Sequence, residues 1–337
     1  MTRWFRLPFV CAVALLAAAC SGGTGGTSGG PATPGASASG SATAGACAVS
    51  PTPADTPDGW DVTSQTPSVF PQIINQSGTV TCGSTRLMFS FLDSQNVPVA
   101  KPDRKVDVKV FDLGADPKKA VAEGPAMFIW AIEPQVGVYV IDLDLPTAGD
   151  YGVEFTTTPA GGSPETIRTT MEVQPTSSVI SVGDKAPASD TPTLDDVGGD
   201  IAKISTDPNP DPDFYTTSIA DAIAAKKPLV VVFATPKFCV SKQCGPTLDR
   251  VKPIAAKHPD VTVINVEPYE LKYADGALQP VLDANGNLTA TKATDEWHLP
   301  TEPWVFVVDK NGIVTNSFML IFSDEELDTA MAAVEKG

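Results

Sequence analysis

The stretch from Lys226 to Asp249 places the strongest constraint on how this chain can fold. It contains an unbroken apolar run, Leu229–Ala234, then two cysteines, Cys239 and Cys244, and then a segment whose apolar residues have helical spacing. An apolar run of this length, rich in β-branched residues, is typical of a central strand that is buried on both faces. The residues therefore predict the order strand, cysteine-bearing loop, helix.

Three parts of the C-terminal half resemble the thioredoxin superfamily. The first is the active-site region, in which Phe238-Cys239 follows a buried strand and Cys244-Gly245-Pro246 opens a helix. The second is residues 182–187, which resemble the opening of membrane-anchored thioredoxin-like reductases and peroxiredoxins. The third is residues 302–312, which resemble the cis-proline strand and the hairpin after it. The resemblance covers roughly residues 179–337 and implies an α/β thioredoxin-like fold there.

The cysteine spacing departs from that family, because four residues separate Cys239 from Cys244 where thioredoxins carry two. On an α-helix, residues i and i+5 differ by a rise of about 7.5 Å, and their Cα atoms are roughly 8.6 Å apart. That separation exceeds the reach of a disulfide. If the two cysteines pair, Cys239 must therefore lie in the loop before the helix. Pro246 agrees with this placement, since proline is tolerated in a first helical turn.

We expect Cys239 and Cys244 to form a redox-active pair in which Cys244 attacks the substrate. A helix N-terminus favours the thiolate, and Lys237 and Lys242 lie close in sequence, so the pKa of Cys244 should be lowered. The opposite assignment, with Cys239 attacking, follows from aligning Phe238-Cys239 with the aromatic-cysteine pair of the family. A further alternative is a structural disulfide that only closes the loop.

The resemblance also implies a substrate-binding role for Glu302 and Pro303. Pro303 directly precedes an apolar strand, Trp304–Val308, as the cis-proline does in thioredoxin-like relatives. Glu302 would then offer its backbone to an extended substrate. Pro300 is the competing candidate for the cis-proline.

A metal set is an alternative for the same cysteines. Cys239, Cys244 and His298 resemble the copper ligands of the thioredoxin-like chaperones that serve cytochrome oxidase assembly. That family spaces its cysteines by three residues and follows the second with proline, whereas here the spacing is four and Gly245 follows. We therefore expect no metal or other cofactor, and we expect His298 to be a surface or core residue.

The start of the chain predicts export and lipid anchoring. Arg3 and Arg6 precede the apolar stretch Leu7–Ala19, which is too short for an ordinary membrane span. Residues 16–20 resemble a bacterial lipobox that ends in Cys20. We therefore expect a signal peptide at residues 1–19 and a protein held by lipid on the extracytoplasmic face of a bacterial membrane. The alternative is a plain secretory signal that is cut near Ala19.

The remaining cysteines predict two disulfides. Cys11 would leave with the signal and Cys20 would carry lipid, so four of the six cysteines remain. An even number in an exported protein suggests pairing, here as Cys47–Cys82 and Cys239–Cys244.

The composition before residue 176 predicts a tether and an all-β domain. Residues 20–59 are mostly Gly, Ser, Thr, Ala and Pro, a composition that buries too little apolar surface to fold. Residues 60–175 contain short alternating segments separated by turn residues, and six or seven strands of this kind suggest an antiparallel immunoglobulin-like β-sandwich. Residues 145–151 resemble the tyrosine corner of that fold, which implies a structural Tyr151, and we expect Trp130 in the core. The clearest strands are Arg86–Leu92, Val106–Leu113, Met127–Ile132, Val138–Leu145, Tyr151–Thr157 and Thr166–Val173.

The expected architecture is thus two domains, the sandwich at 60–175 and the thioredoxin-like domain at 176–337. The formal net charge of −17 makes nucleic acid a poor partner, so the expected partners are the membrane, through the lipid, and protein thiols or disulfides. The predicted function is that of an envelope lipoprotein with thiol–disulfide oxidoreductase activity. The alternatives are a non-catalytic binding or scaffold lipoprotein with a structural disulfide, and a copper chaperone.

Overall fold

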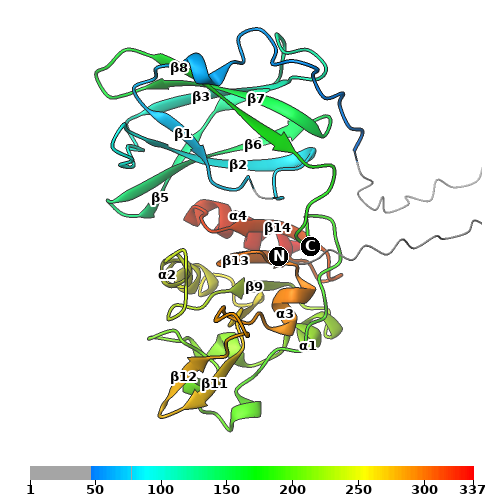
Figure 1. Ribbon diagram of the computed structural model, residues 1–337. Coiled ribbons are helices and arrows are strands. Elements are labelled where there is room, and N and C mark those ends of the chain that lie inside the picture. Colours follow the sequence, from blue (N-terminus) through cyan, green and yellow to red (C-terminus); the bar gives the residue numbers. More distant parts are fainter. Residues whose placement is uncertain (1–46, 77) are drawn as a thin grey trace, which may run out of the picture. The chain divides into compact units, whose positions relative to one another are not determined.

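The computed structural model describes residues 47–76 and 78–337. Strands between Phe70 and Val173 form two four-stranded antiparallel sheets, and strands between Leu229 and Met319 form a mixed four-stranded sheet (Figure 1). The predicted order of an all-β region followed by a region of strands and helices is confirmed. The predicted signal peptide and Cys20 lie outside the described residues. In the part that is described, no helix has the length and apolar character needed to cross a membrane.

The β-sandwich region has eight strands rather than the six or seven expected. The additional strands, β1 and β4, lie at sheet edges, and their sequences contain Pro71 or small and charged residues that hide the alternation. One sheet has the order β1-β2-β6-β5 and the other the order β4-β3-β7-β8. The strands are β1 (Phe70–Ile73), β2 (Gly83–Leu92), β3 (Lys105–Asp112), β4 (Ala120–Pro125), β5 (Met127–Ile132), β6 (Val136–Leu145), β7 (Gly149–Thr158) and β8 (Glu165–Val173).

Aromatic side chains fill the centre of this sandwich. Phe89 and Phe155 come from different sheets, and their ring centroids lie 4.6 Å apart in the buried core. The hydroxyl of Tyr151 donates a hydrogen bond to the backbone carbonyl of Thr147 over 2.9 Å, as a tyrosine corner requires, so the structural role expected for Tyr151 is confirmed. The expectation for Trp130 is wrong, because this side chain is only half-buried.

The segment before Trp60 contacts the sandwich, although its composition predicts a tether. The backbone amide of Ser50 donates to the carbonyl of Ala148 over 2.8 Å, and the amide of Ala148 donates to the carbonyl of Ala48 over 3.0 Å. Cys47 and Cys82 form the predicted disulfide, with 6.3 Å between their Cα atoms. Backbone pairing and a covalent bond thus hold a segment that has little apolar surface to bury.

Asp112 joins this segment to the tyrosine corner. One carboxylate oxygen of the buried Asp112 accepts hydrogen bonds of 2.6 Å from the hydroxyls of Ser50 and Thr147. The other oxygen accepts from the backbone amides of Gly114 and Ala115. Burial alone raises the pKa of Asp112, but these hydrogen bonds outweigh it and hold the pKa below its usual value.

The C-terminal sheet has the strand order β10-β9-β13-β14, in which only the β9–β10 pair is parallel. Its strands are β9 (Leu229–Phe233), β10 (Thr262–Val266), β13 (Trp304–Val308) and β14 (Val314–Met319). The α-helices are α1 (Ile219–Ala224), α2 (Cys244–Ala255), α3 (Lys292–Glu296) and α4 (Asp324–Lys336). The described residues also form the 3₁₀ helices η1 (Val62–Ser64), η2 (Asp195–Val197), η3 (Ile201–Lys203) and η4 (Pro212–Tyr215).

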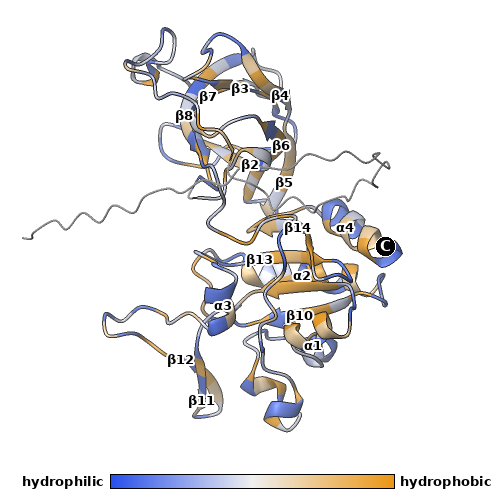
Figure 2. Cartoon of the chain, turned by 90° about the vertical axis from the view of Figure 1, so that its right-hand side faces the viewer, coloured by the Kyte–Doolittle hydropathy of each residue, from blue (hydrophilic) through white to orange (hydrophobic). Residues whose placement is uncertain are grey.

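Helices cover both faces of this sheet, which explains the continuous apolar sequence of its strands. Val230 and Val232 of β9 face one core, which α2 and α4 complete. Leu229, Val231 and Phe233 face the other core, to which α1 and α3 contribute. Figure 2 shows the strands of this sheet mainly in the colour of hydrophobic residues. Burial on both faces follows from the apolar run, as predicted.

The connection between β10 and β13 contains a hairpin that the alternation pattern does not predict. Its strands are β11 (Leu271–Ala274) and β12 (Ala277–Pro280), and the turn residues Asp275 and Gly276 both have positive φ angles, of 52° and 78°. Two positive φ angles define a type I′ turn, for which Asp-Gly is a strong signal. Ser218 caps the start of α1, and Ser323 forms a capping box with Glu326 at the start of α4.

Candidate functional site

The register of the C-terminal sheet brings three chain segments to one edge. Phe233, the last residue of β9, pairs with Trp304, the first residue of β13, because these strands are antiparallel. Phe233 also pairs with Val266, the last residue of β10, because those strands are parallel. The cysteine loop after β9, Glu302 before β13 and Glu267 after β10 therefore lie at the same end of the sheet.

Cys239 and Cys244 form the predicted disulfide at this edge. Helix α2 begins at Cys244, and Cys239 lies in the loop before it, with 6.0 Å between the two Cα atoms. This separation is within the normal range for a disulfide. The prediction that Cys239 must lie outside the helix is confirmed, and it explains how a pair separated by four residues can close.

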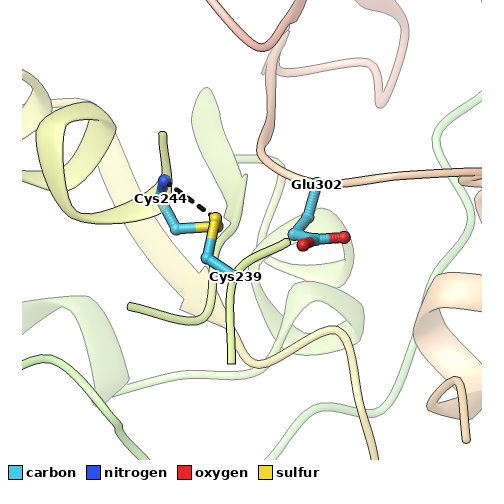
Figure 3. A group of neighbouring side chains, drawn as sticks. All are labelled: Cys239, Cys244 and Glu302. Carbon is cyan, nitrogen blue, oxygen red and sulfur yellow. Dashed lines mark hydrogen bonds between the residues drawn. A yellow bond between two sulfur atoms is a disulfide. The ribbon is translucent and has the colours of Figure 1, made fainter. Parts of the chain in front are cut away.

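The two sulfurs have different surroundings. Cys244 has no exposed surface, whereas Cys239 is half-buried. The backbone amide of Cys244 donates a hydrogen bond to the sulfur of Cys239 over 3.2 Å (Figure 3). The hydroxyl of Ser241 lies 3.3 Å from the same sulfur. The first amide of the helix thus donates to the sulfur of Cys239. The sequence predicts Cys244 as the attacking cysteine.

The lysines expected to assist the thiolate are directed elsewhere. The ammonium group of Lys237 donates to the carbonyl of Leu278 in β12 over 2.8 Å and lies 5.2 Å from the centroid of the Phe238 ring. Lys242 is exposed, with a positive φ of 63° just before α2. Neither lysine forms an ion pair among the described residues.

Glu302 attaches the segment before β13 to the cysteine loop. Its buried carboxylate accepts a 2.8 Å hydrogen bond from the amide of Val240 and a second hydrogen bond from the hydroxyl of Tyr269. Its backbone carbonyl accepts a 2.9 Å hydrogen bond from Ser241. That carbonyl already accepts one hydrogen bond from within the protein, and the substrate-binding role expected for Glu302 stays a prediction.

Tyr269 is a site residue that the motifs do not predict. Its pKa is raised above the usual value, first by burial and then by the hydrogen bond and negative charge of Glu302. The only sequence signal is its place just after β10, because the ends of parallel neighbouring strands meet at one edge. The Glu302–Pro303 peptide bond is cis, as predicted, and Leu299–Pro300 is not among the cis bonds of the described residues.

Thr206 links Glu267 to the segment that leads to Cys239. One of its carboxylate oxygens accepts a 2.6 Å hydrogen bond from the amide of Thr206, and the other has no hydrogen-bond partner in the described residues. The hydroxyl of Thr206 accepts from the amide of Lys237 and lies 3.4 Å from the hydroxyl of Thr235. Burial raises the pKa of Glu267 to about 7, and the nearby polar groups of Thr235 and Thr206 only partly oppose this effect.

His298 is not placed with the cysteines. It is exposed and has a positive φ of 56° after α3, whereas its neighbour Trp297 is fully buried and donates to the hydroxyl of Ser189. The residue whose ligand atom does approach both sulfurs is Glu302, and the three ligand atoms all lie within 4.8 Å of one another. The copper set that includes His298 is therefore not assembled in the described structure.

A cavity of about 240 Å³ lies next to these residues. Its lining includes Tyr269, which binds Glu302, and Leu278, whose carbonyl binds Lys237. Asn265 and Glu267 contribute polar atoms to the same cavity. The disulfide edge therefore has a neighbouring space in which a substrate side chain could lie.

Comparison with known proteins gives distant likenesses. No protein-family model matches the chain, and no curated protein matches it. Among solved structures, a DUF4426 family protein from Pseudomonas aeruginosa is similar with 15% identity over 32% of this chain and 89% of that chain, at a TM-score of 0.23. The soluble domain of PmoD from a Methylocystis species is similar with 13% identity over 31% of this chain and 90% of that chain, at a TM-score of 0.21. The Lin-41 filamin domain is similar with 14% identity over 31% of this chain and 92% of that chain, at a TM-score of 0.19. At these scores the likenesses carry no argument about function.

Proposed function

We propose that the C-terminal region is a thioredoxin-like domain that exchanges disulfides with proteins through Cys239 and Cys244. The observation that carries the proposal is that the sulfur of the half-buried residue Cys239 accepts a hydrogen bond from the first backbone amide of α2. Backbone amides at a helix N-terminus stabilise negative charge, so they favour the thiolate form of a cysteine. The thiolate is the nucleophile in disulfide exchange.

In this proposal Cys239 attacks and Cys244 resolves. An attacking sulfur must be reached by a substrate disulfide, and Cys244 has no exposed surface. Cys239 is more accessible, and the loop that carries it includes the strongly exposed Val240, at 76%. The surroundings of the two sulfurs thus favour the alternative assignment over the one in which Cys244 attacks.

The cellular setting agrees with this chemistry. Two disulfides in the described residues are typical of a protein in an oxidising, extracytoplasmic compartment. We further propose that lipid on Cys20 holds the protein at a membrane, because basic residues, a short apolar stretch and a lipobox-like sequence precede that cysteine. A mature N-terminus at Cys20, found by mass spectrometry of the membrane fraction, is the expected result. A different N-terminus on soluble protein would contradict the anchor.

The second candidate function is a binding or scaffold lipoprotein whose C-terminal disulfide is only structural. The favouring observation is that Glu302, Ser241 and Tyr269 already tie the cysteine loop to the rest of the fold. A loop held in this way does not need to open in order to be stable.

A redox titration of the full chain separates the two functions. The protein is equilibrated at defined ratios of reduced to oxidised dithiothreitol, free thiols are alkylated, and peptide mass spectrometry reports the Cys239–Cys244 and Cys47–Cys82 pairs separately. Structural disulfides of secreted proteins have reduction potentials below about −300 mV, while catalytic ones lie higher. We expect the reduction potential of Cys239–Cys244 to lie above that value and the reduction potential of Cys47–Cys82 to lie below it. Equal resistance of the two pairs to reduction would support the scaffold function.

A further inference from the structure

Three potential metal ligands converge at the disulfide edge. The sulfurs of Cys239 and Cys244 and a carboxylate oxygen of Glu302 all lie within 4.8 Å of one another. Figure 3 draws these three side chains, which come from the loop before α2, the first residue of α2 and the segment before β13. In the oxidised protein the sulfurs are bonded to each other and have no free thiolate to offer a metal.

Reduction changes the charge at this edge. Glu302 is 2% exposed and forms no ion pair among the described residues, and the donors to its carboxylate, the Val240 amide and the Tyr269 hydroxyl, are neutral. Two thiols would then lie beside a buried carboxylate that forms no ion pair in the described part of the chain. The amide at the start of α2 can support one thiolate, on Cys239, but a second thiolate on the fully buried Cys244 would add a like charge beside Glu302, which is unfavourable unless a cation compensates.

We infer that reduction of the Cys239–Cys244 disulfide creates a binding site for Zn²⁺, with Cys239, Cys244 and Glu302 as its ligands. Zinc binds thiolates at about 2.3 Å and carboxylate oxygens at about 2.0 to 2.2 Å in a tetrahedral arrangement. A carboxylate beside two thiolates favours zinc over Cu(I), which prefers soft ligands throughout. The inference rests on one part of the proposed function, that the pair can be reduced.

The surroundings of Glu302 resemble the support that metal ligands receive in other proteins. Carboxylates that bind metals are themselves held by hydrogen bonds, and loss of such a partner typically lowers metal affinity 10- to 100-fold. Val240 and Tyr269 provide these bonds here and fix the carboxylate toward the sulfurs. The half-buried Cys239 leaves a side from which the metal and a fourth ligand, water, can enter.

The chemistry has two separate steps. A dithiol or phosphine reductant supplies two electrons to the Cys239–Cys244 bond, and the sulfurs take up two protons while the reductant is oxidised. Zn²⁺ then displaces those two protons and forms two zinc–sulfur bonds and one zinc–oxygen bond. Because zinc binds only the reduced pair, it should protect the thiols from reoxidation.

The test is titration of the full chain with Zn²⁺, and with Co²⁺ as a spectroscopic probe, before and after reduction by tris(2-carboxyethyl)phosphine. We expect one additional Zn²⁺ per reduced chain, and with Co²⁺ a thiolate charge-transfer band with the visible bands of tetrahedral coordination. The double variant Cys239→Ser/Cys244→Ser retains every other cysteine and should lose this additional site. Glu302→Gln should bind Zn²⁺ at least 10-fold more weakly, and Tyr269→Phe should show a smaller loss.

Glu270→Gln is the matched control, because Glu270 is an exposed carboxylate next to Tyr269 and should leave binding unchanged. Reduced protein that exchanges disulfides but binds no more zinc than the double variant would overturn the metal site alone. Equal affinity of Glu302→Gln and wild type would overturn the three-ligand set. A thiol count showing that Cys239–Cys244 stays oxidised at strongly reducing poise would overturn both the metal site and the proposed function.

Discussion

The backbone amide of Cys244 donates a hydrogen bond of 3.2 Å to the sulfur of Cys239, so the first amide of α2 faces the cysteine that lies outside the helix. In the proposed function, this amide favours the thiolate form of Cys239 when the disulfide opens. In the proposed exchange, the fully buried Cys244 is the resolving cysteine.

The first prediction concerns the roles of the two cysteines. Cys244→Ser should accumulate a mixed disulfide between Cys239 and a thiol-bearing substrate, because the resolving sulfur is missing. Cys239→Ser should form no mixed disulfide, because the accessible nucleophile is missing. Non-reducing electrophoresis with a disulfide-linked model peptide measures both. If the two variants show the opposite behaviour, Cys244 attacks, and if wild type shows no exchange, the pair is structural.

The second prediction concerns the carboxylate of Glu302. Glu302→Ala should lower the free energy of unfolding by about 1 to 3 kcal/mol, because the Val240 amide and the Tyr269 hydroxyl lose their acceptor in a buried place. Glu302→Gln keeps one carbonyl oxygen and should recover most of this loss. Urea unfolding of the oxidised proteins provides the comparison. A Glu302→Ala variant as stable as wild type would mean that the cysteine loop does not depend on this contact.

The third prediction concerns Glu267 and pH. Its pKa is about 7 in the folded protein, above the ordinary 4.5, so the folded state favours the neutral carboxyl. The penalty for ionising this group is absent below about pH 4.5 and grows until about pH 7, so stability should fall over that range. Glu267→Gln should remove this dependence and gain up to roughly 2 to 3 kcal/mol relative to wild type at pH 8.

The control for this comparison is Glu270→Gln, an exposed carboxylate that should leave the pH profile of wild type unchanged. Unfolding free energies at pH 5 and pH 8 are sufficient to decide. Parallel profiles for wild type and Glu267→Gln would show that the carboxyl of Glu267 ionises normally in the fold.

The fourth prediction concerns Asp112 in the sandwich. Asp112→Asn should destabilise the protein by about 2 to 3 kcal/mol, because an amide cannot accept from Ser50, Thr147 and the two backbone amides at once. The folded pKa is lowered, so the stabilisation is present above the usual pKa of an aspartate and is lost as pH falls through the folded value. Asp107→Asn, at an exposed position on β3, is the matched control. Similar unfolding free energies for the two variants would exclude this role.

The fifth prediction concerns the Cys47–Cys82 disulfide. The double variant Cys47→Ser/Cys82→Ser should lose about 3 to 4 kcal/mol, because in the chain-entropy model the bond restricts a loop of this size in the unfolded state. Calorimetry of the variant and the oxidised wild type should show the loss as a lower Tm. Equal Tm values would indicate that the hydrogen bonds of residues 48–50 are sufficient without the covalent bond.

The sequence predicts the elements whose patterns are strong and local. The apolar run at Leu229–Phe233 gives the buried strand, the spacing argument places Cys239 outside α2, and Ser323 marks the start of α4. Each of these depends on a few neighbouring residues. The two edge strands of the sandwich are harder to predict, because edge positions do not require a continuous apolar face.

The contacts at the disulfide edge are less predictable because they depend on long-range strand pairing. Tyr269 and Glu302 are separated by 33 positions, and only the arrangement of β10 and β13 on either side of β9 brings their side chains together. The attacking role predicted for Cys244 depends on its place at the helix start and on Lys237 and Lys242 nearby in sequence. The burial of each sulfur depends on the packing of α2 against the sheet, which spacing does not reveal.

The position of Cys82 determines how the sandwich responds to a pulling force applied through the residues before Cys47. Cys82 directly precedes β2, an inner strand of its sheet, so tension would pass through the sulfurs straight to that strand. Trp60 and the edge strand β1 lie inside the closed loop and would carry none of it. A pulling force on the residues before Cys47 should therefore leave the edge strand β1 in place. Mechanical unfolding of this sheet should instead require shearing of β2 from its neighbouring strands.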